Sequence, residues 1–382
     1  MTFKSLTVLV FALLASVFSI GQQAHEEVRK AMQPFLDSND IPGFVYLVAD
    51  ANKVLEVDGY GYADIAAKKK MDQDKLFWIA SQSKPFAGTA VMMLVDEGKL
   101  SLDSPITKYL PELNNLMVRR INRDNVVVLE RPNKPVTLRR LLSHTSGMEY
   151  LPGLQRQSGT IDQLPLFKSV YVTNMTPLAC EPGDSIIYSN QGMDIAAATV
   201  ERVSGMLYQD FLRKRIFDPL GMKSATFWPS EKQFENMALP YRRDGKQLIV
   251  STIKALQYPF SDTTKRFAEA GGGLFCTPRD LVKFYQLIAN KGVYNGKRLL
   301  SEAAVAELGK RQTSDKITPP WGLAWAIGPD FMGHGGALGT QSRLYIDEGV
   351  IFMFFIQSNG LPKEKDSFRT VEKIVKKAYG VK

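Results

Sequence analysis

The alternation of apolar and polar residues predicts a chain of mixed helices and strands. Residues 26–36 have a helical period with an apolar side, which predicts an amphipathic helix. Apolar runs at 43–49 and 54–57, separated by a short polar turn, predict two paired strands. Another apolar run at 76–80 predicts a strand, and the longer run at 87–95 predicts a buried helix.

The middle of the chain has a different pattern, in which prolines separate short segments. Residues 117–130 predict a hairpin whose tip lies at 122–125. Residues 194–203 and 208–217 have a helical period, and the second of these helices ends before a Pro-Leu-Gly-Met turn. This part of the chain therefore predicts a helical lobe.

Strand patterns return near the C-terminus. Residues 323–327, 342–346 and 350–357 predict strands, and 367–379 predict a final helix. Thr277 and Pro278 suit the cap and first position of a further helix. Because strands at the two ends of a chain commonly complete one sheet, we expect an α+β fold. Its mostly antiparallel sheet would be flanked by helices, with the helical lobe inserted.

The first 21 residues have the pattern of a secretory signal peptide. Lys4 precedes an apolar run at 6–18, and small residues stand at Ser19 and Gly21, which predicts cleavage between Gly21 and Gln22. The alternative interpretation is an uncleaved membrane anchor, but the apolar run is short for a helix that spans a membrane. We therefore expect a periplasmic or secreted protein without a stable membrane span after cleavage.

These patterns divide the chain into a signal peptide and one large domain. The domain would cover residues 22–382, since an apolar content of 45% over this length supports a large buried core. Residues 22–100 together with 255–382 would form an α/β lobe, and 101–254 would form the helical lobe.

The formal net charge of +9 is spread along the chain rather than clustered. The densest patches are Arg119, Arg120 and Arg123 with Arg131, and Arg139 with Arg140. A solvated basic surface explains them, and attraction to an anionic envelope polymer or membrane surface is the alternative. No motif supports nucleic-acid binding.

The two cysteines, Cys180 and Cys276, could pair or stay as free thiols, and the pattern leaves both states open. They do not form a C-x-x-C motif, and no histidine-rich metal motif is present, so we expect neither a metal nor another cofactor.

Candidate chemistry begins at Ser81 and Lys84, which lie where the predicted strand gives way to the predicted helix. Residues three apart on a helix share a face, so the hydroxyl and the amine can meet. A lysine beside a serine can take its proton, and a helix N-terminus favours the negative charge that results. Taken alone, the pair also fits a capping serine beside a solvated lysine.

Three further segments complete a candidate site. Tyr188-Ser189-Asn190 precedes a predicted helix, His144 begins a His-Thr-Ser-Gly stretch, and His334-Gly335-Gly336-Ala337 precedes a predicted strand. Each segment alone also fits an ordinary structural role: Tyr188-Ser189-Asn190 a helix cap, His144 a hydrogen-bonded loop residue, and the glycines after His334 a turn. Their occurrence together, in this order, favours a functional site.

With these motifs the chain resembles the serine β-lactamase and penicillin-binding-protein superfamily, most closely its class C-like branch. S-x-x-K is matched by Ser81 and Lys84, Y-x-N by Tyr188 and Asn190, and the third motif by His334-Gly335-Gly336. The branch also contains esterases, D-peptidases and transacylases. The resemblance extends over roughly residues 27 to 380.

The resemblance implies acyl-enzyme chemistry. Ser81 would attack a carbonyl, and Tyr188 would act as general base and later activate water. A free tyrosine has a pKa of about 10, so this role needs a neighbouring cation, for which Lys84 is the candidate. Asn190 would orient Lys84 or the acyl amide. The backbone N–H groups of Ser81 and Ala337 would form the oxyanion hole.

The third motif departs from the Lys-Thr-Gly of the class C β-lactamases. His334-Gly335-Gly336 lacks the fixed cation and the hydroxyl that hold a substrate carboxylate. The glycines at 335 and 336 would let substrate approach the strand closely. We therefore expect an esterase or a peptidase/amidase, with a β-lactamase or D-Ala-D-Ala carboxypeptidase as the alternative.

A non-catalytic cell-wall binding module on the same fold is the rival from another class, and the intact Ser81, Lys84 and Tyr188 argue against it. A Ser-His-Asp hydrolase would need a G-x-S-x-G elbow, which the chain lacks. The expected partners are a small ester, amide or β-lactam, or a cell-wall peptide. The sequence leaves the natural substrate and the oligomeric state open.

Overall fold

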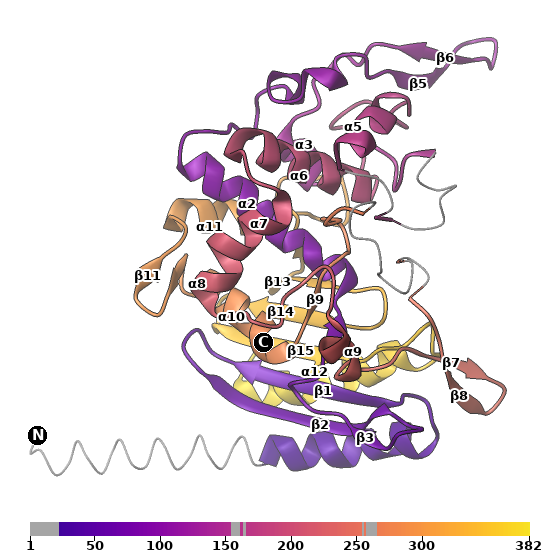
Figure 1. Ribbon diagram of the computed structural model, residues 1–382, viewed down its shortest axis with the longest axis vertical. Helices are drawn as coiled ribbons and strands as arrows, with labels where there is room; N and C mark the ends of the chain where they lie inside the picture. The colour runs from indigo at the N-terminus through magenta and orange to yellow at the C-terminus, as the bar shows by residue number, and fades with distance from the viewer. Residues whose placement is uncertain (1–22, 154–160, 163–165, 254–255, 257–265) are drawn as a thin grey trace, which may run out of the picture.

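The computed structural model describes residues 23–153, 161–162, 166–253, 256 and 266–382. A seven-stranded antiparallel sheet forms one end of the molecule and helices pack over it (Figure 1). The sheet contains β1 (Gly43–Ala49), β2 (Val54–Asp64), β3 (Lys69–Lys70), β12 (Ala326–Ile327), β13 (Phe331–Gly335), β14 (Gln341–Tyr345) and β15 (Val350–Phe355). The α+β class predicted from the sequence is confirmed.

The remaining strands form two-stranded pairs. These are β4 (Phe77–Trp78) with β9 (Phe275–Cys276), β5 (Val118–Ile121) with β6 (Val127–Glu130), β7 (Tyr241–Asp244) with β8 (Gln247–Val250), and β10 (Val293–Tyr294) with β11 (Lys297–Arg298). The predicted hairpin at 117–130 is therefore present as β5–β6, and its tip lies where expected.

The helices carry most of the rest of the chain. The labelled α-helices are α2 (Lys84–Asp96), α3 (Leu138–Leu142), α5 (Leu166–Asn174), α6 (Asn190–Ser204), α7 (Tyr208–Leu212), α8 (Asp218–Leu220), α9 (Glu231–Glu235), α10 (Pro278–Ala289), α11 (Glu302–Gly309) and α12 (Glu364–Tyr379). A π-helical turn at Arg213–Phe217 joins α7 to α8, and another helix covers residues 23–37. Short 3₁₀ turns lie at Ala80–Ser83, Ile106–Lys108 and Pro111–Leu113.

The central pair of the large sheet joins the two ends of the chain, as the sequence predicted. The strand order is β12-β13-β14-β15-β1-β2-β3, and Tyr46 of β1 stands opposite Phe354 of β15. Successive side chains point to opposite faces. Phe44, Tyr46 and Val48 therefore pack toward α12 and the 23–37 helix, while the intervening residues face the larger core beside α10.

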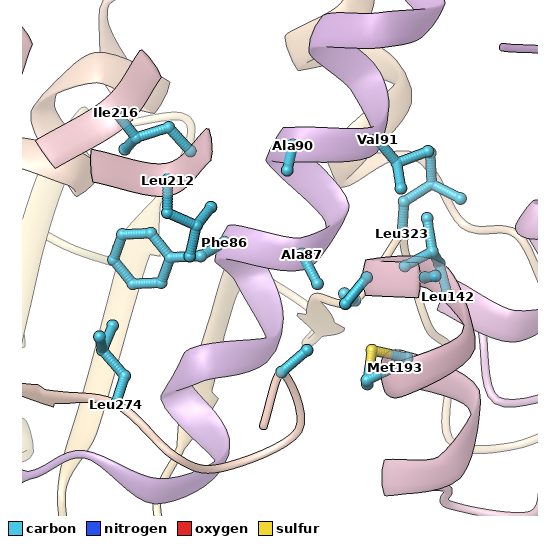
Figure 2. Packing of buried hydrophobic residues seen from close by; sticks show 14 of the residues in the cluster. Phe86, Ala87, Ala90, Val91, Leu142, Met193, Leu212, Ile216, Leu274 and Leu323 are labelled. Carbon is cyan, nitrogen blue, oxygen red and sulfur yellow. The ribbon is translucent and has the colours of Figure 1, made fainter. Parts of the chain in front are cut away.

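The larger core is built around α2, a helix that is buried over almost its whole length. The Phe86 ring stacks on Phe284 with 4.0 Å between centroids, and Figure 2 shows Phe86 beside Leu212 and Leu274. On the opposite side of the helix, a Cβ on Gly88 would stand 2.3 Å from the Leu323 carbonyl oxygen. Burying a side chain such as Phe86 contributes about 1.5–3 kcal/mol. This packing fixes the helix whose first residue is Lys84.

Two predicted strands are shorter than the patterns suggest. Only Phe77–Trp78 of the 76–80 run is strand, because Ala80 has φ of +46° and begins a 3₁₀ turn. Only Ala326–Ile327 of the 323–327 run is strand, because Ala324 has φ of +65° and its N–H donates to the Leu142 carbonyl. Tertiary contacts override the apolar pattern at both places.

Other boundaries moved outward. The predicted 194–203 helix begins at Asn190, because the Ser189 side chain caps it by accepting the Gly192 N–H at 2.8 Å. The final helix begins at Glu364 rather than 367. Thr277 caps α10 and Pro278 is its first residue, as predicted.

The predicted signal peptide lies outside the described residues. Among the residues that the structure does describe, no helix is long and apolar enough to cross a membrane. Cys180 and Cys276 are both free thiols, and Cys276 is buried. The lobe boundaries stay a prediction, and α2, placed in the α/β lobe by sequence, packs against α6 and α7 of the helical lobe as well as against α11.

Candidate active site

Ser81 lies in a 3₁₀ turn, Ala80–Ser83, between β4 and the start of α2. A hydrogen bond holds the residue before this turn in place: the Ile79 N–H donates to the Leu274 carbonyl at 3.0 Å. Ala80 takes the left-handed φ of +46°, a conformation that costs a non-glycine residue free energy and turns the chain sharply. The result is a partly exposed Ser81 hydroxyl on a rigid turn.

Lys84 connects the turn to two distant segments. Its side chain is fully buried, and its Nζ donates to Ser81 Oγ (3.1 Å), Asn190 Oδ1 (2.8 Å) and the Gly271 carbonyl (2.5 Å). An ammonium has three N–H donors, so all three are used. The amine is therefore held in one position beside the Ser81 hydroxyl.

Tyr188 and Asn190 are placed by the start of α6. Ser189 is the cap, so Tyr188 immediately precedes the helix and Asn190 is its first residue. The Lys84 Nζ lies 4.6 Å from the centroid of the Tyr188 ring. The Tyr188 ring is partly exposed, as is Ser81. The structure thus gathers Ser81, Lys84, Tyr188 and Asn190, which the sequence selected, around one ammonium group.

His144 lies behind Tyr188 rather than at the surface. It is fully buried, its φ is +60°, and its Nδ1 accepts the Ser189 N–H at 3.1 Å. Its ring centroid lies 4.4 Å from that of Tyr188 and 4.6 Å from that of Trp321. Burial, with the charge of Lys84 adding to it, lowers the pKa of His144 well below its usual value, so the ring is neutral.

His334 is also a neutral imidazole. It lies in β13, and its Nδ1 donates to the Gly335 carbonyl at 2.7 Å. Burial, followed by the nearby charge of Lys84, lowers the pKa of His334 to about 3. Its ring lies 6.3 Å from Tyr188 and 5.6 Å from Trp321, centroid to centroid. His334 and Trp321 therefore form an aromatic, uncharged surface beside Tyr188.

The glycine after Gly335 allows the strand to pass close to the Ser81 turn. A Cβ on Gly336 would stand 2.4 Å from the Ile79 carbonyl oxygen and 2.2 Å from Thr340 Oγ1. No residue larger than glycine fits without moving this backbone. The glycine at 336 therefore lets the strand approach the protein's own backbone at Ile79, rather than a substrate. This approach places the exposed Ala337 beside the turn that contains Ser81.

Two buried carboxyl groups near Lys84 were not selected from the sequence. Glu269 is fully buried, and burial raises its pKa to about 8 although Lys84 opposes the shift. Asp194 accepts the Ala270 N–H at 3.2 Å, and burial together with Glu269 raises its pKa well above the usual value. A carboxylate buried in this way retains a proton because its charged form is poorly solvated. The only available signal was that Glu269 precedes the glycine triplet at 271–273.

Two aromatic residues of the site, Tyr150 and Trp321, were also not selected from the sequence. The Tyr150 ring stacks on Tyr188 with 6.4 Å between centroids, and the Asn190 Nδ2 donates to its hydroxyl at 3.4 Å. The Trp321 ring lies 5.6 Å from the Tyr188 ring, centroid to centroid, whereas Trp325 is fully buried against Phe284. Aromatic residues in core and site look alike in sequence, so only the fold separates them. Across the described ranges, no group of three His, Cys, Asp or Glu side chains is arranged to hold a metal ion.

Comparison of the sequence with protein-family models shows the family to which this chain belongs. The family model described as Beta-lactamase matches residues 28–376, which is most of the chain. The chain belongs to the beta-lactamase family. It is a serine hydrolase of the β-lactamase-related type, as the motifs indicated.

Family members similar to this chain have diverse descriptions. An uncharacterized protein of Mycobacterium tuberculosis is 31% identical over 290 residues, which cover 74% of this chain and 70% of the relative. Lovastatin esterase of Penicillium rubens is 28% identical over 330 residues, covering 83% and 80% of the two chains. The unliganded structure of simvastatin synthase from Aspergillus terreus has a TM-score of 0.77 at 20% identity, covering 94% and 99%. That last likeness shows the β-lactamase-related fold.

Proposed function

We propose that this protein is an exported serine hydrolase that forms an acyl-enzyme on Ser81 and acts chiefly as an esterase, or as a related peptidase or amidase. The proposal is supported by the Ser81 hydroxyl, which lies 3.1 Å from a fully buried Lys84 amine. It is also supported by family membership and by two relatives described as esterases, lovastatin esterase and an esterase of Burkholderia gladioli.

In the proposed reaction, Ser81 Oγ attacks the carbonyl carbon and its proton passes to the side-chain oxygen of Tyr188, the proposed general base, beside the Lys84 ammonium. The tetrahedral intermediate then collapses, the bond to the leaving oxygen or nitrogen breaks, and Tyr188 donates the proton to that leaving group. Water enters next and gives its proton to Tyr188, and its oxygen attacks the acyl carbon. This second step releases the acid and returns the proton to Ser81.

Other residues of the site would hold these groups in place. The N–H groups of Ser81 and Ala337 would bind the oxyanion, a role that the closeness of Gly336 to the Ser81 turn supports. Asn190 orients the Lys84 amine through its 2.8 Å contact. His144, which contacts the Tyr188 ring and the Ser189 N–H, would act as a positioning residue for Tyr188.

The burial of His334 beside Trp321, with its Nδ1 bonded to the Gly335 carbonyl, is the observation that carries the ester preference. A β-lactam or a peptide ending in D-Ala has a carboxylate that a fixed cation would bind. His334 has a pKa of about 3, because it is buried and close to Lys84, so it offers no such cation at neutral pH. A neutral surface containing Trp321 and His334 suits an uncharged ester or amide better.

Replacement of Ser81 tests the assignment of the nucleophile. We expect Ser81→Ala to abolish hydrolysis of p-nitrophenyl acetate and butyrate, and to abolish labelling by a fluorophosphonate. Ser251→Ala is the matched control, because Ser251 begins a second S-x-x-K sequence but its hydroxyl bonds to Asn359. Full ester hydrolysis by Ser81→Ala would refute the proposed nucleophile, and a wild-type protein that no acylating probe labels would indicate a binding module.

A substrate comparison tests the ester preference, and an N-terminal measurement tests export. We expect the wild type to have a higher kcat/KM for p-nitrophenyl esters than for a chromogenic cephalosporin. The reverse order would favour the β-lactamase alternative. Mass spectrometry of protein recovered from the periplasm or medium should find Gln22 as the first residue, and an intact N-terminus there would contradict signal cleavage.

A further inference from the structure

The β5–β6 hairpin has an exposed apolar face. Its register places Ile121 opposite Val127 and Arg119 opposite Leu129, and directly opposed residues of antiparallel strands lie on the same face. The Ile121, Val127 and Leu129 side chains are 68%, 58% and 51% exposed. We call these four residues the hairpin face. Such a ladder of exposed aliphatic side chains marks an interaction surface.

The opposite side of the hairpin attaches it to the rest of the protein. Val118 is buried there, and Arg120 forms ion pairs with Glu130 (2.9 Å) and Glu181 (2.6 Å). The Arg119 N–H also donates to the Leu178 carbonyl at 2.9 Å. The hairpin face is therefore turned away from the body, and Figure 1 shows the hairpin projecting at the end of the molecule far from the large sheet.

Positive charge borders the hairpin face. Arg119 lies on it and Arg123 lies at its tip, and both side chains are exposed. Within the part of the chain that the structure describes, neither guanidinium forms an ion pair or hydrogen bond. Glu130 is already paired with Arg120 on the opposite side, which leaves Asp124 as the acid at the tip. Aliphatic side chains bordered by unpaired arginines suit a surface that is apolar inside and anionic outside.

We propose that the hairpin face docks this protein onto an anionic lipid bilayer. Ile121, Val127 and Leu129 enter the boundary between head groups and acyl chains, and Arg119 and Arg123 bind lipid phosphates in the bidentate manner that guanidinium groups favour. The net charge of +9 draws the protein toward the same surface. A second copy of the chain fits less well, because pairing two such faces would bring their unpaired arginines together.

Vesicle flotation tests this docking. The purified chain is mixed with vesicles of phosphatidylcholine alone, or of phosphatidylcholine with phosphatidylglycerol, and the bound fraction is measured at low and high salt. The apolar variant is Ile121→Thr with Val127→Thr, which keeps β-branched residues in the strands. The charge variant is Arg119→Gln with Arg123→Gln. The control is Val250→Thr with Arg242→Gln in the β7–β8 hairpin, where Val250 is 52% exposed and Arg242 is exposed.

We expect binding to vesicles that contain phosphatidylglycerol, weaker binding at high salt, and little binding to phosphatidylcholine alone. Each arginine should contribute about fivefold to the partition constant, so the charge variant should lose roughly 25-fold. The apolar variant should lose binding, and the control should keep it. All three variants should hydrolyse soluble p-nitrophenyl esters as the wild type does, which shows that they fold.

Several results would overturn the proposal. Absence of binding to anionic vesicles, or equal binding by the hairpin variants and the control, would show that the hairpin face does not bind lipid. Light scattering gives the third arm of the test. A wild-type dimer that the apolar variant converts to a monomer, without lipid binding, would assign the hairpin face to a contact between copies of the chain.

Discussion

Gly271→Ala should inactivate this enzyme by moving atoms that hold Lys84. A Cβ at this position would stand 2.6 Å from both Asn190 Cγ and Glu269 Oε1. Ordinary contact begins at 3.4 Å, so one of these groups or the Gly271 backbone must move by roughly 0.8 Å. Asn190 Oδ1 and the Gly271 carbonyl both accept an N–H of Lys84, so a displacement of either one moves an acceptor that holds the Lys84 amine.

The expected magnitude follows from that displacement. Misplacing a catalytic group by about 1 Å can cost 10²-fold in rate, and overpacking of a well-packed site typically costs about 1–3 kcal/mol of unfolding free energy. We therefore expect kcat/KM for p-nitrophenyl butyrate to fall about 10²-fold, and urea unfolding to show a loss of about 1–3 kcal/mol.

The neighbouring glycine provides the matched control. A Cβ on Gly272 would meet the end of the Glu269 side chain at 3.3 Å, and the Ala80 carbonyl carbon and Ile161 Cδ1 at 3.6 Å, which is ordinary contact. Gly272→Ala should therefore change kcat/KM by less than about threefold. Wild-type kcat/KM in Gly271→Ala, or equal damage in the two variants, would refute the claim that the Gly271 position controls Lys84.

Three further predictions concern the base, a buried acid and the core. Tyr188→Phe should lower kcat/KM about 10²-fold or more at an unchanged melting temperature, and a smaller loss would move the base role elsewhere. Burial raises the pKa of Glu269 from 4.5 to about 8, so the stability that its proton confers is complete below about pH 4.5 and is lost as the pH rises through 8. Glu269→Gln should flatten the fall in melting temperature over that range, and a fall parallel to that of the wild type would contradict the assignment. Phe86→Ala should cost about 3–5 kcal/mol by urea unfolding, whereas Val54→Ala at a 40% exposed position should cost little, and similar losses would refute the packing argument.

Much of the fold could be predicted because its signals are local. The continuous apolar runs of β1 and β15 reflect burial on both faces of one sheet, and Thr277-Pro278 describes a helix start in two residues. The strands at 76–80 and 323–327 were predicted too long because distant groups end them. The Ala324 N–H donates to the Leu142 carbonyl, a partner far away in the chain.

The sequence by itself determined the family and the group of residues around Ser81, because S-x-x-K, Y-x-N and His-Gly-Gly are short motifs whose residue types are fixed by their local chemistry. The tertiary structure alone decided their surroundings. It placed His144 behind Tyr188, buried His334 so that it is neutral, and brought Glu269 beside Lys84. These properties depend on desolvation and on contacts between residues far apart in the chain, and neither leaves a pattern in the local sequence.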